Sequence, residues 1–185
     1  MDTQKLLSSV EDALVTEIAD AVGKMFFMEP LYAILIDYFH WTYLPTPTCD
    51  LDTRPPLVVA APISVRREII DGHDYADAVQ WDAYYVAEVD GSVKLQLSTD
   101  GEASVLCRDV YGSFDEGDES LGTMLQRVAA RLNACNWRSI TNVTDDFVVC
   151  LQDGHGEHDN EKDIDACIPP DKVSLLRSRK LLWSW

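Results

Sequence analysis

The sequence has no apolar run long enough to cross a membrane. A bilayer core requires about 18 to 20 consecutive apolar residues, and the longest apolar clusters cover only residues 31–36 and 57–61. The N-terminus also lacks a secretory signal, because acidic residues stand where such a signal carries positive charge and no long apolar stretch follows. We therefore expect a cytoplasmic protein without a membrane partner.

Cysteine is sparse and scattered. The five cysteines are odd in number and form no CxxC pair, which fits neither a disulfide framework nor a zinc ribbon. They are Cys49, Cys107, Cys135, Cys150 and Cys167. Free thiols in a reducing compartment are the expectation, and Cys150, inside the apolar run of residues 147–151, is expected to be buried.

Basic side chains are scarce. The chain has 15 lysines and arginines against 32 acidic side chains, for a formal net charge of -17. Such a charge repels phosphate backbones and anionic lipids, so the sequence predicts no nucleic-acid and no membrane-surface binding. A basic protein is the natural complement, and the alternative is acidity that only keeps the protein soluble.

Motifs for catalysis and nucleotide binding are missing. The sequence has no GxxxxGK[ST] loop, no GxGxxG after a strand and no nucleophile elbow. His40 and His73 stand alone, so a hydrolase triad has nothing to support it. We predict no catalytic residues, no cofactor and no enzymatic activity.

The chain does have the composition of one globular domain. Apolar residues make up 46% and charged residues 25% of its 185 positions, which is enough for a packed core. No repeat, linker or change of composition divides it, so residues 1–185 are expected to form a single domain. Trp81 and Trp137, beside expected elements, are assigned to core packing.

Periodicity in the first half of the chain predicts one helix and then strands. Apolar residues recur at steps of three and four over residues 3–25, as in an amphipathic helix. Residues 31–38 are dense in β-formers and predict a strand, and the proline-bearing residues 42–52 predict an irregular second one. Residues 57–60 suit either a strand or the start of a helix that runs toward Ile70.

The second half alternates between strands and helices. Asp90 and Gly91 separate residues 81–89 from residues 93–98 and indicate a hairpin. The remaining expected elements are a short strand at 103–107, a helix that ends near 135, a strand at 146–151 and a basic helix at 171–182. The order of these elements predicts an α+β fold, with N-terminal, middle and C-terminal helices packed on an antiparallel or mixed central sheet.

An acidic, histidine-containing stretch covers residues 153–165. Imidazole and carboxylate groups at short range can bind a divalent metal, and the candidate ligands are His155, Glu157, His158 and Asp159. The spacing fits neither HExxH nor an EF-hand loop, which needs glycine where His158 stands. A solvated polar connection is the alternative interpretation.

Four stretches resemble a known protein family. The opening amphipathic helix, residues 31–52 and the two late segments 144–153 and 168–182 are similar to small acidic bacterial proteins encoded beside polymorphic or secreted toxins. Members of that family are regarded as immunity proteins. The resemblance implies an α+β fold and binding of a cognate toxin in place of catalysis.

Three functional hypotheses follow. The first is an acidic, non-catalytic binding protein, a candidate immunity protein that neutralises a cognate basic toxin or enzyme. Its expected contact residues are Asp115, Glu116, Asp118, Glu119, Asp153, Glu157, Asp159, Glu161 and Asp163. The second is a metal-binding module or metal-dependent hydrolase that uses His155 and His158, and the third is an interaction protein whose acidity serves solubility.

Overall fold

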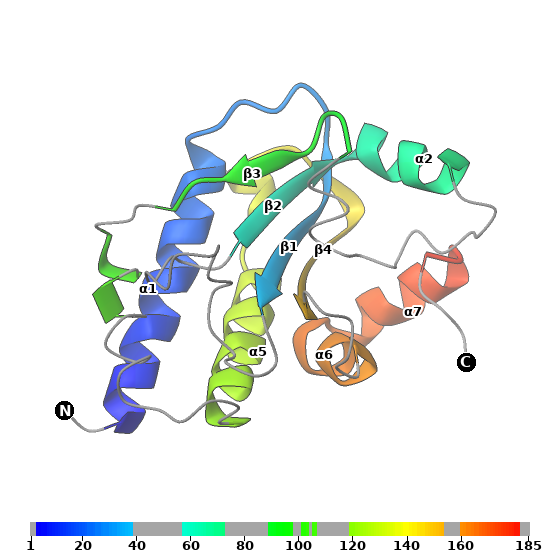
Figure 1. Cartoon of the computed structure of the whole chain (residues 1–185). Coiled ribbons are helices and arrows are strands. Elements are labelled where there is room, and N and C mark those ends of the chain that lie inside the picture. The colour runs from blue at the N-terminus through cyan, green and yellow to red at the C-terminus, as the bar shows by residue number, and fades with distance from the viewer. Residues whose placement is uncertain are drawn as a thin grey trace.

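One mixed β-sheet organises the molecule. The computed structural model describes residues 3–38, 57–72, 89–97, 101–103, 105–106, 119–153 and 160–181. Within them, four strands pair in the order β3-β2-β1-β4. Their bounds are β1 Leu31–Tyr38, β2 Leu57–Pro62, β3 Val93–Leu95 and β4 Val143–Asp153 (Figure 1). The expected α+β fold is confirmed.

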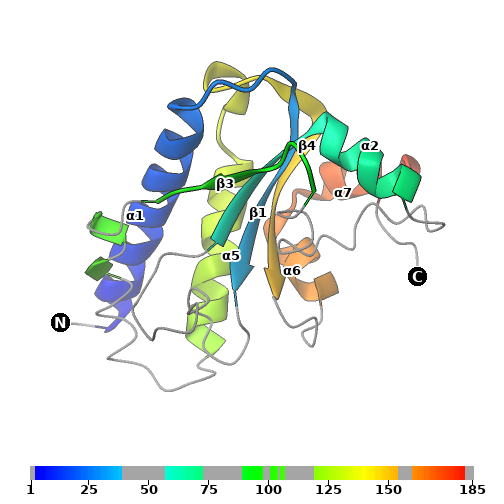
Figure 2. The same ribbon diagram turned by 45° about the horizontal axis from the view of Figure 1, so that its top comes forward.

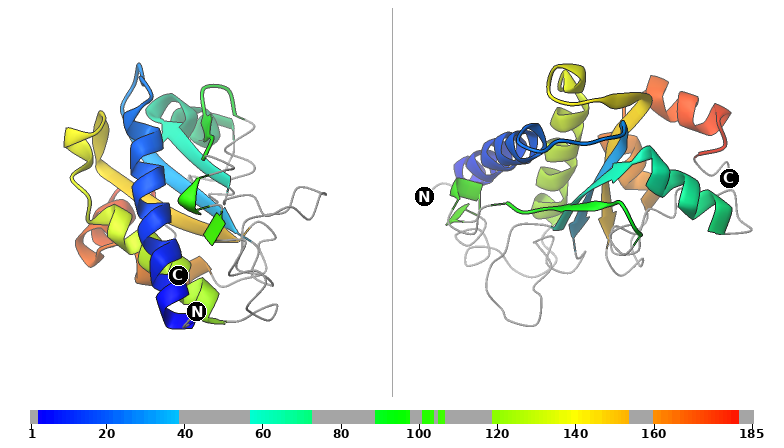
Figure 3. Two further views of the ribbon diagram at one scale, coloured as in Figure 1. Left: turned by 90° about the vertical axis from the view of Figure 1, so that its left-hand side faces the viewer. Right: turned by 90° about the horizontal axis from the view of Figure 1, so that it is seen from above.

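Helices lie on both sides of this sheet. They are α1 Thr3–Gly23, α2 Ile63–Gly72, α5 Glu119–Asn133, α6 Asn160–Cys167, α7 Pro170–Ser178 and the short 3-10 helix η1 Trp137–Ser139. α1 and α5 pack together on one side, and α2 and α7 lie on the other (Figures 2 and 3). None of the described helices is long and apolar enough to span a membrane.

The apolar pattern of the chain explains these elements. α1 buries Val10, Leu14, Ile18 and Val22, which recur at steps of three or four residues and therefore share one face. The expected strand at residues 31–38 is confirmed with the same bounds, and residues 31–37 are all buried. A strand covered on both sides reads as a continuous apolar run, as this one does.

β1 is the centre of the sheet. It pairs antiparallel with β2 and parallel with β4, so that Leu35 lies between Val59 and Cys150. The expected burial of Cys150 and Trp137 is confirmed, and the Trp137 ring packs 5.4 Å from that of Phe147. The Trp137 indole nitrogen donates a hydrogen bond to the carbonyl of Leu132, which satisfies its one polar group in the core.

Several predicted elements differ from the structure. Residues 57–62 form the strand β2, which confirms the strand alternative for residues 57–60, and the helix that runs toward Ile70 begins only at Ile63. The expected strand at 103–107 is wrong, because residues 105–106 are helical and the Val105 amide donates to the Gly101 carbonyl one turn earlier. The acidic stretch 153–165 is not loop throughout, since α6 begins at Asn160. The predictions for residues 42–52 and 81–88 lie outside the described residues.

Candidate functional site

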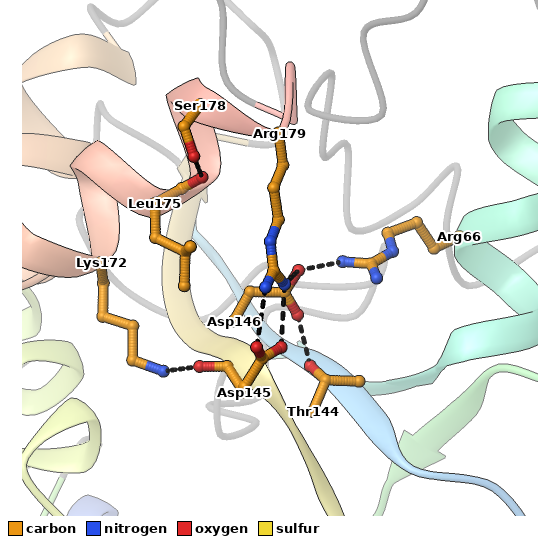
Figure 4. A network of polar contacts seen from close by, with 8 residues as sticks. All are labelled: Arg66, Thr144, Asp145, Asp146, Lys172, Leu175, Ser178 and Arg179. Atoms are coloured by element: carbon orange, nitrogen blue, oxygen red, sulfur yellow. Dashed lines mark hydrogen bonds and ion pairs between the residues drawn. The ribbon is translucent and has the colours of Figure 1, made fainter.

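A buried carboxylate joins three elements on the α2 and α7 side of the sheet. Asp146 of β4 has a fully buried side chain, and its Oδ2 accepts hydrogen bonds from Arg66 of α2 at 3.0 Å and from Arg179 at 2.8 Å. Its Oδ1 accepts from the Thr144 hydroxyl at 2.6 Å. Figure 4 shows both guanidinium groups converging on this carboxylate. All its charge is therefore compensated within the chain.

Asp145, the neighbour of Asp146, holds Arg179 from the solvent side. The two Asp145 oxygens accept from Arg179 Nη1 at 2.8 Å and Nη2 at 2.7 Å, a bidentate geometry. These hydrogen bonds lower the pKa of Asp145 to about 2. Burial acts to raise the pKa of Asp146, but the hydrogen bonds from Thr144 and Arg179 and the charge of Arg66 outweigh it, so this pKa is also lowered.

The charged side chains around Asp146, namely Arg66, Arg179 and Asp145, each have a partner of opposite charge. The guanidinium carbon of Arg66 lies 5.1 Å from the centre of the Tyr32 ring, a cation–π contact. Burial raises the pKa of the Tyr32 hydroxyl, so this group stays neutral at physiological pH. Because each charge in the cluster has its partner, the cluster fixes α2 and the end of α7 to β4.

A second set of ion pairs joins α1 to α5. Glu11 accepts from Arg127 at 2.8 Å and from Arg131 at 3.0 Å, and Asp12 accepts from Arg131 at 2.7 Å. With Arg66 and Arg179, four arginines of the described chain are therefore held by its own carboxylates. These cations are not free to balance the remaining acids at the surface.

An acidic hollow of about 230 Å³ opens beside α1. It is lined by Ser9, Asp12, Ala13, Thr16, Glu17 and Glu102. The hydroxyls of Ser9 and Thr16 donate to backbone carbonyls one turn back, so toward the hollow they act as acceptors. Glu17 also accepts from the Ala103 amide at 2.9 Å. Asp12 is already paired with Arg131, but Glu17 and Glu102 with no base in the lining still make this hollow suited to a cationic side chain.

An exposed apolar turn follows α1. Met25, Phe26 and Met28 are 40%, 89% and 91% exposed, whereas Phe27 packs against the core. We call residues 25–28 the apolar turn. The sequence reading missed it, although the apolar run MFFM between an expected helix and an expected strand was its visible signal.

The predicted contact residues lie mostly where the structure gives no side-chain position. Asp115, Glu116, Asp118, Glu157 and Asp159 are outside the described residues, and Glu119, Asp153 and Glu161 are described in their backbone alone. Asp163 is different, because it is only 2% exposed and accepts a hydrogen bond from Gln126 at 2.9 Å. Burial removes Asp163 from any contact surface.

The structure does not test the hypothesis of a metal site at residues 155–159. His155, Glu157, His158 and Asp159 all lie outside the part of the chain that the structure describes. Within that part, no three His, Cys, Asp or Glu side chains are grouped so as to hold a metal ion. Cys150 and Cys167 are buried, and burial raises the pKa of both thiols, which keeps them protonated.

No protein-family model, curated protein or solved structure matches this chain. The features of this α+β protein that bear on function are therefore its net charge of -17, the acidic hollow and the exposed apolar turn.

Proposed function

We propose that this protein is a non-catalytic binding protein that neutralises a basic protein, such as a cognate toxin or enzyme, by covering it. The observation that supports the proposal most is how the chain uses its few cations. Arg66, Arg127, Arg131 and Arg179 are engaged by Glu11, Asp12, Asp145 and Asp146, while the net charge of the chain is -17. These four arginines are thus engaged within the described chain, and the whole sequence carries 32 acidic against 15 basic side chains.

Such a surface acts first on the rate of association. Complementary charge raises association rate constants by about 10- to 1000-fold, and the effect weakens as salt shortens the Debye length to about 8 Å. Exposed ion pairs contribute only about 0 to 1 kcal/mol each to affinity. Acids therefore select a basic partner and speed its capture, and tight binding needs buried contacts as well.

The acidic surface has a described part and a part that stays a prediction. Asp20 is exposed on α1, and Glu17 of α1 and Glu102 line the acidic hollow, whereas Asp12 is already paired with Arg131. The predicted acids at residues 115–119 and 153–161 would extend this surface. The resemblance to toxin-associated immunity proteins agrees with this use of charge.

An affinity pull-down from the native cell, at low and at moderate salt, tests the proposal. With the full-length protein as bait and mass spectrometry as readout, we expect one basic protein at low salt and less of it at moderate salt. A variant lacking four predicted contact acids should retain less: Asp115→Asn, Glu116→Gln, Asp118→Asn and Glu119→Gln.

The matched control removes four exposed acids elsewhere: Glu68→Gln, Asp90→Asn, Asp165→Asn and Asp171→Asn. It changes net charge equally, so it separates a specific contact surface from charge in general. Equal retention by the wild type and by both variants, without an effect of salt, would refute the electrostatic proposal.

A further inference from the structure

The apolar turn carries the largest exposed apolar side chains of the described chain. Phe26 and Met28 are 89% and 91% exposed, against 45% for Val105, the next highest. Single exposed apolar residues are common, but two nearly bare large ones within three positions form a patch. Burial of large apolar side chains stabilises an association by removing apolar surface from water. Within the described chain Phe26 and Met28 receive almost none of this stabilisation.

The turn is also held firmly in place. On its α1 side, the Met25 amide donates to the Val22 carbonyl at 3.1 Å. On its β1 side, Glu29 accepts from the Ser64 amide at 3.0 Å and the Pro30 carbonyl accepts from the Ile63 amide at 3.0 Å. Phe27 packs against the core between the exposed side chains. A pre-ordered turn loses little conformational entropy when a partner binds it.

Charge indicates which partner fits. Asp20 is exposed on the last turns of α1, and Glu17 and Glu102 line the acidic hollow beside this helix. Lys24 is the one base in the described residues 17–30, and Asp12 is already paired with Arg131. At a rise of 1.5 Å per residue, about 9 Å of helix separate Glu17 from the end of α1 at Gly23, just before the apolar turn.

We propose that the apolar turn is the anchor of the partner interface: Phe26 and Met28 enter an apolar pocket of the basic protein whose lysines or arginines face the acids of α1. This inference rests on the proposed function. Exposed aromatic and methionine side chains are typical anchors, because their burial excludes water from the centre of an interface. Loss of the anchor acts on dissociation, and loss of the acids acts on association.

Photo-crosslinking in the native cell identifies the partner at the turn. The full-length protein carries benzoylphenylalanine at Phe26, and a control carries it at Ser174, which is exposed on α7 on the other side of the sheet. We expect one adduct with a basic protein at position 26 and none at position 174. No adduct at position 26, or an adduct with a second copy of this chain, overturns the inference.

The partner that crosslinking identifies is then purified in its free form. Its binding kinetics with this protein distinguish the proposed anchor from the proposed function. The variant Phe26→Ser with Met28→Ser should dissociate about 10- to 100-fold faster at an association rate within about twofold of the wild type. Because both side chains are exposed, its urea midpoint should stay unchanged. An unchanged dissociation rate overturns the anchor, even where association remains sensitive to salt. The other outcome is a partner that is not basic and whose association rate does not depend on salt. If the double variant dissociates faster from such a partner, the result supports the anchor and refutes the proposed function.

Discussion

At the scale of single residues, Asp146 has the largest structural consequence. It is a fully buried carboxylate that neutralises Arg66 and Arg179, whose side chains are 16% and 38% exposed. An Asp146→Asn change keeps the shape and removes the charge. Removing one partner of a buried ion pair costs about 3 to 5 kcal/mol, and we expect about 3 because Arg179 keeps Asp145. Urea unfolding measures the loss, and the exposed Asp165→Asn serves as control.

Asp145 gives a dependence on pH with a defined sign. Its pKa falls from 3.8 to about 2 on folding, so the stability that it contributes is complete above about pH 4 and is lost as pH falls through 2. Asp145→Asn should therefore weaken the fall in unfolding free energy between pH 4 and pH 2. An identical pH profile for the variant and the wild type would show that the ion pair with Arg179 does not form in solution.

At the scale of elements, one side chain satisfies the outer edge of β4 at Val149. Val149 lies on the edge that faces away from β1, and the Asn133 amide at the end of α5 donates to its carbonyl at 2.7 Å and accepts from its amide at 2.8 Å. Asn133 also donates to the Cys167 carbonyl of α6 at 2.7 Å. One asparagine thus replaces a strand neighbour and ties α6 to the sheet.

We expect Asn133→Ala to cost about 3 kcal/mol, from three hydrogen bonds of about 1 kcal/mol each. Hydrogen exchange of the Val149 amide should accelerate in this variant, since its acceptor is gone. Asn142→Ala, at an exposed position just before β4, is the matched control and should change neither quantity. Slow exchange at Val149 in the Asn133 variant would mean that another group closes this edge.

Local pattern predicts some elements and not others. α1 and β1 follow from a helical stripe and a compact apolar run, which specify their form without help from distant residues. α6 does not, because its sequence NEKDIDAC is mostly polar and is held by contacts with β4 and α5. The helical residues 105–106 depend on the Gly101 carbonyl and on Glu17 of α1, which accepts from Ala103. A local sequence pattern does not show contacts between residues that are distant in the chain.

At the scale of the whole molecule, sheet order and arginine pairing depend on the global fold. Arg66 meets Asp146 across 80 positions of sequence, and Arg131 meets Asp12 across 119. The excess of acidic residues is visible in the sequence. The sequence does not show which lysines and arginines are paired with carboxylates of the same chain. It also misses the exposure of Phe26, because an apolar residue reads as core until the packing is known.

Excess negative charge should also govern how stability responds to salt. Repulsion among unneutralised acids opposes folding at low ionic strength, and salt screens it by shortening the Debye length from about 30 Å at 0.01 M to about 8 Å at 0.15 M. We therefore expect the urea midpoint to rise between these two concentrations of NaCl. A falling midpoint would instead indicate that the internal ion pairs dominate the response.

The measurement that tests the central claim most directly is the association rate of the captured partner as a function of ionic strength. For an acidic surface that recruits a basic protein, the rate constant should fall about tenfold or more between 0.02 M and 0.2 M NaCl, and the dissociation rate should change much less. An association rate that is insensitive to salt would contradict the proposed function, and the acidity would then serve solubility alone.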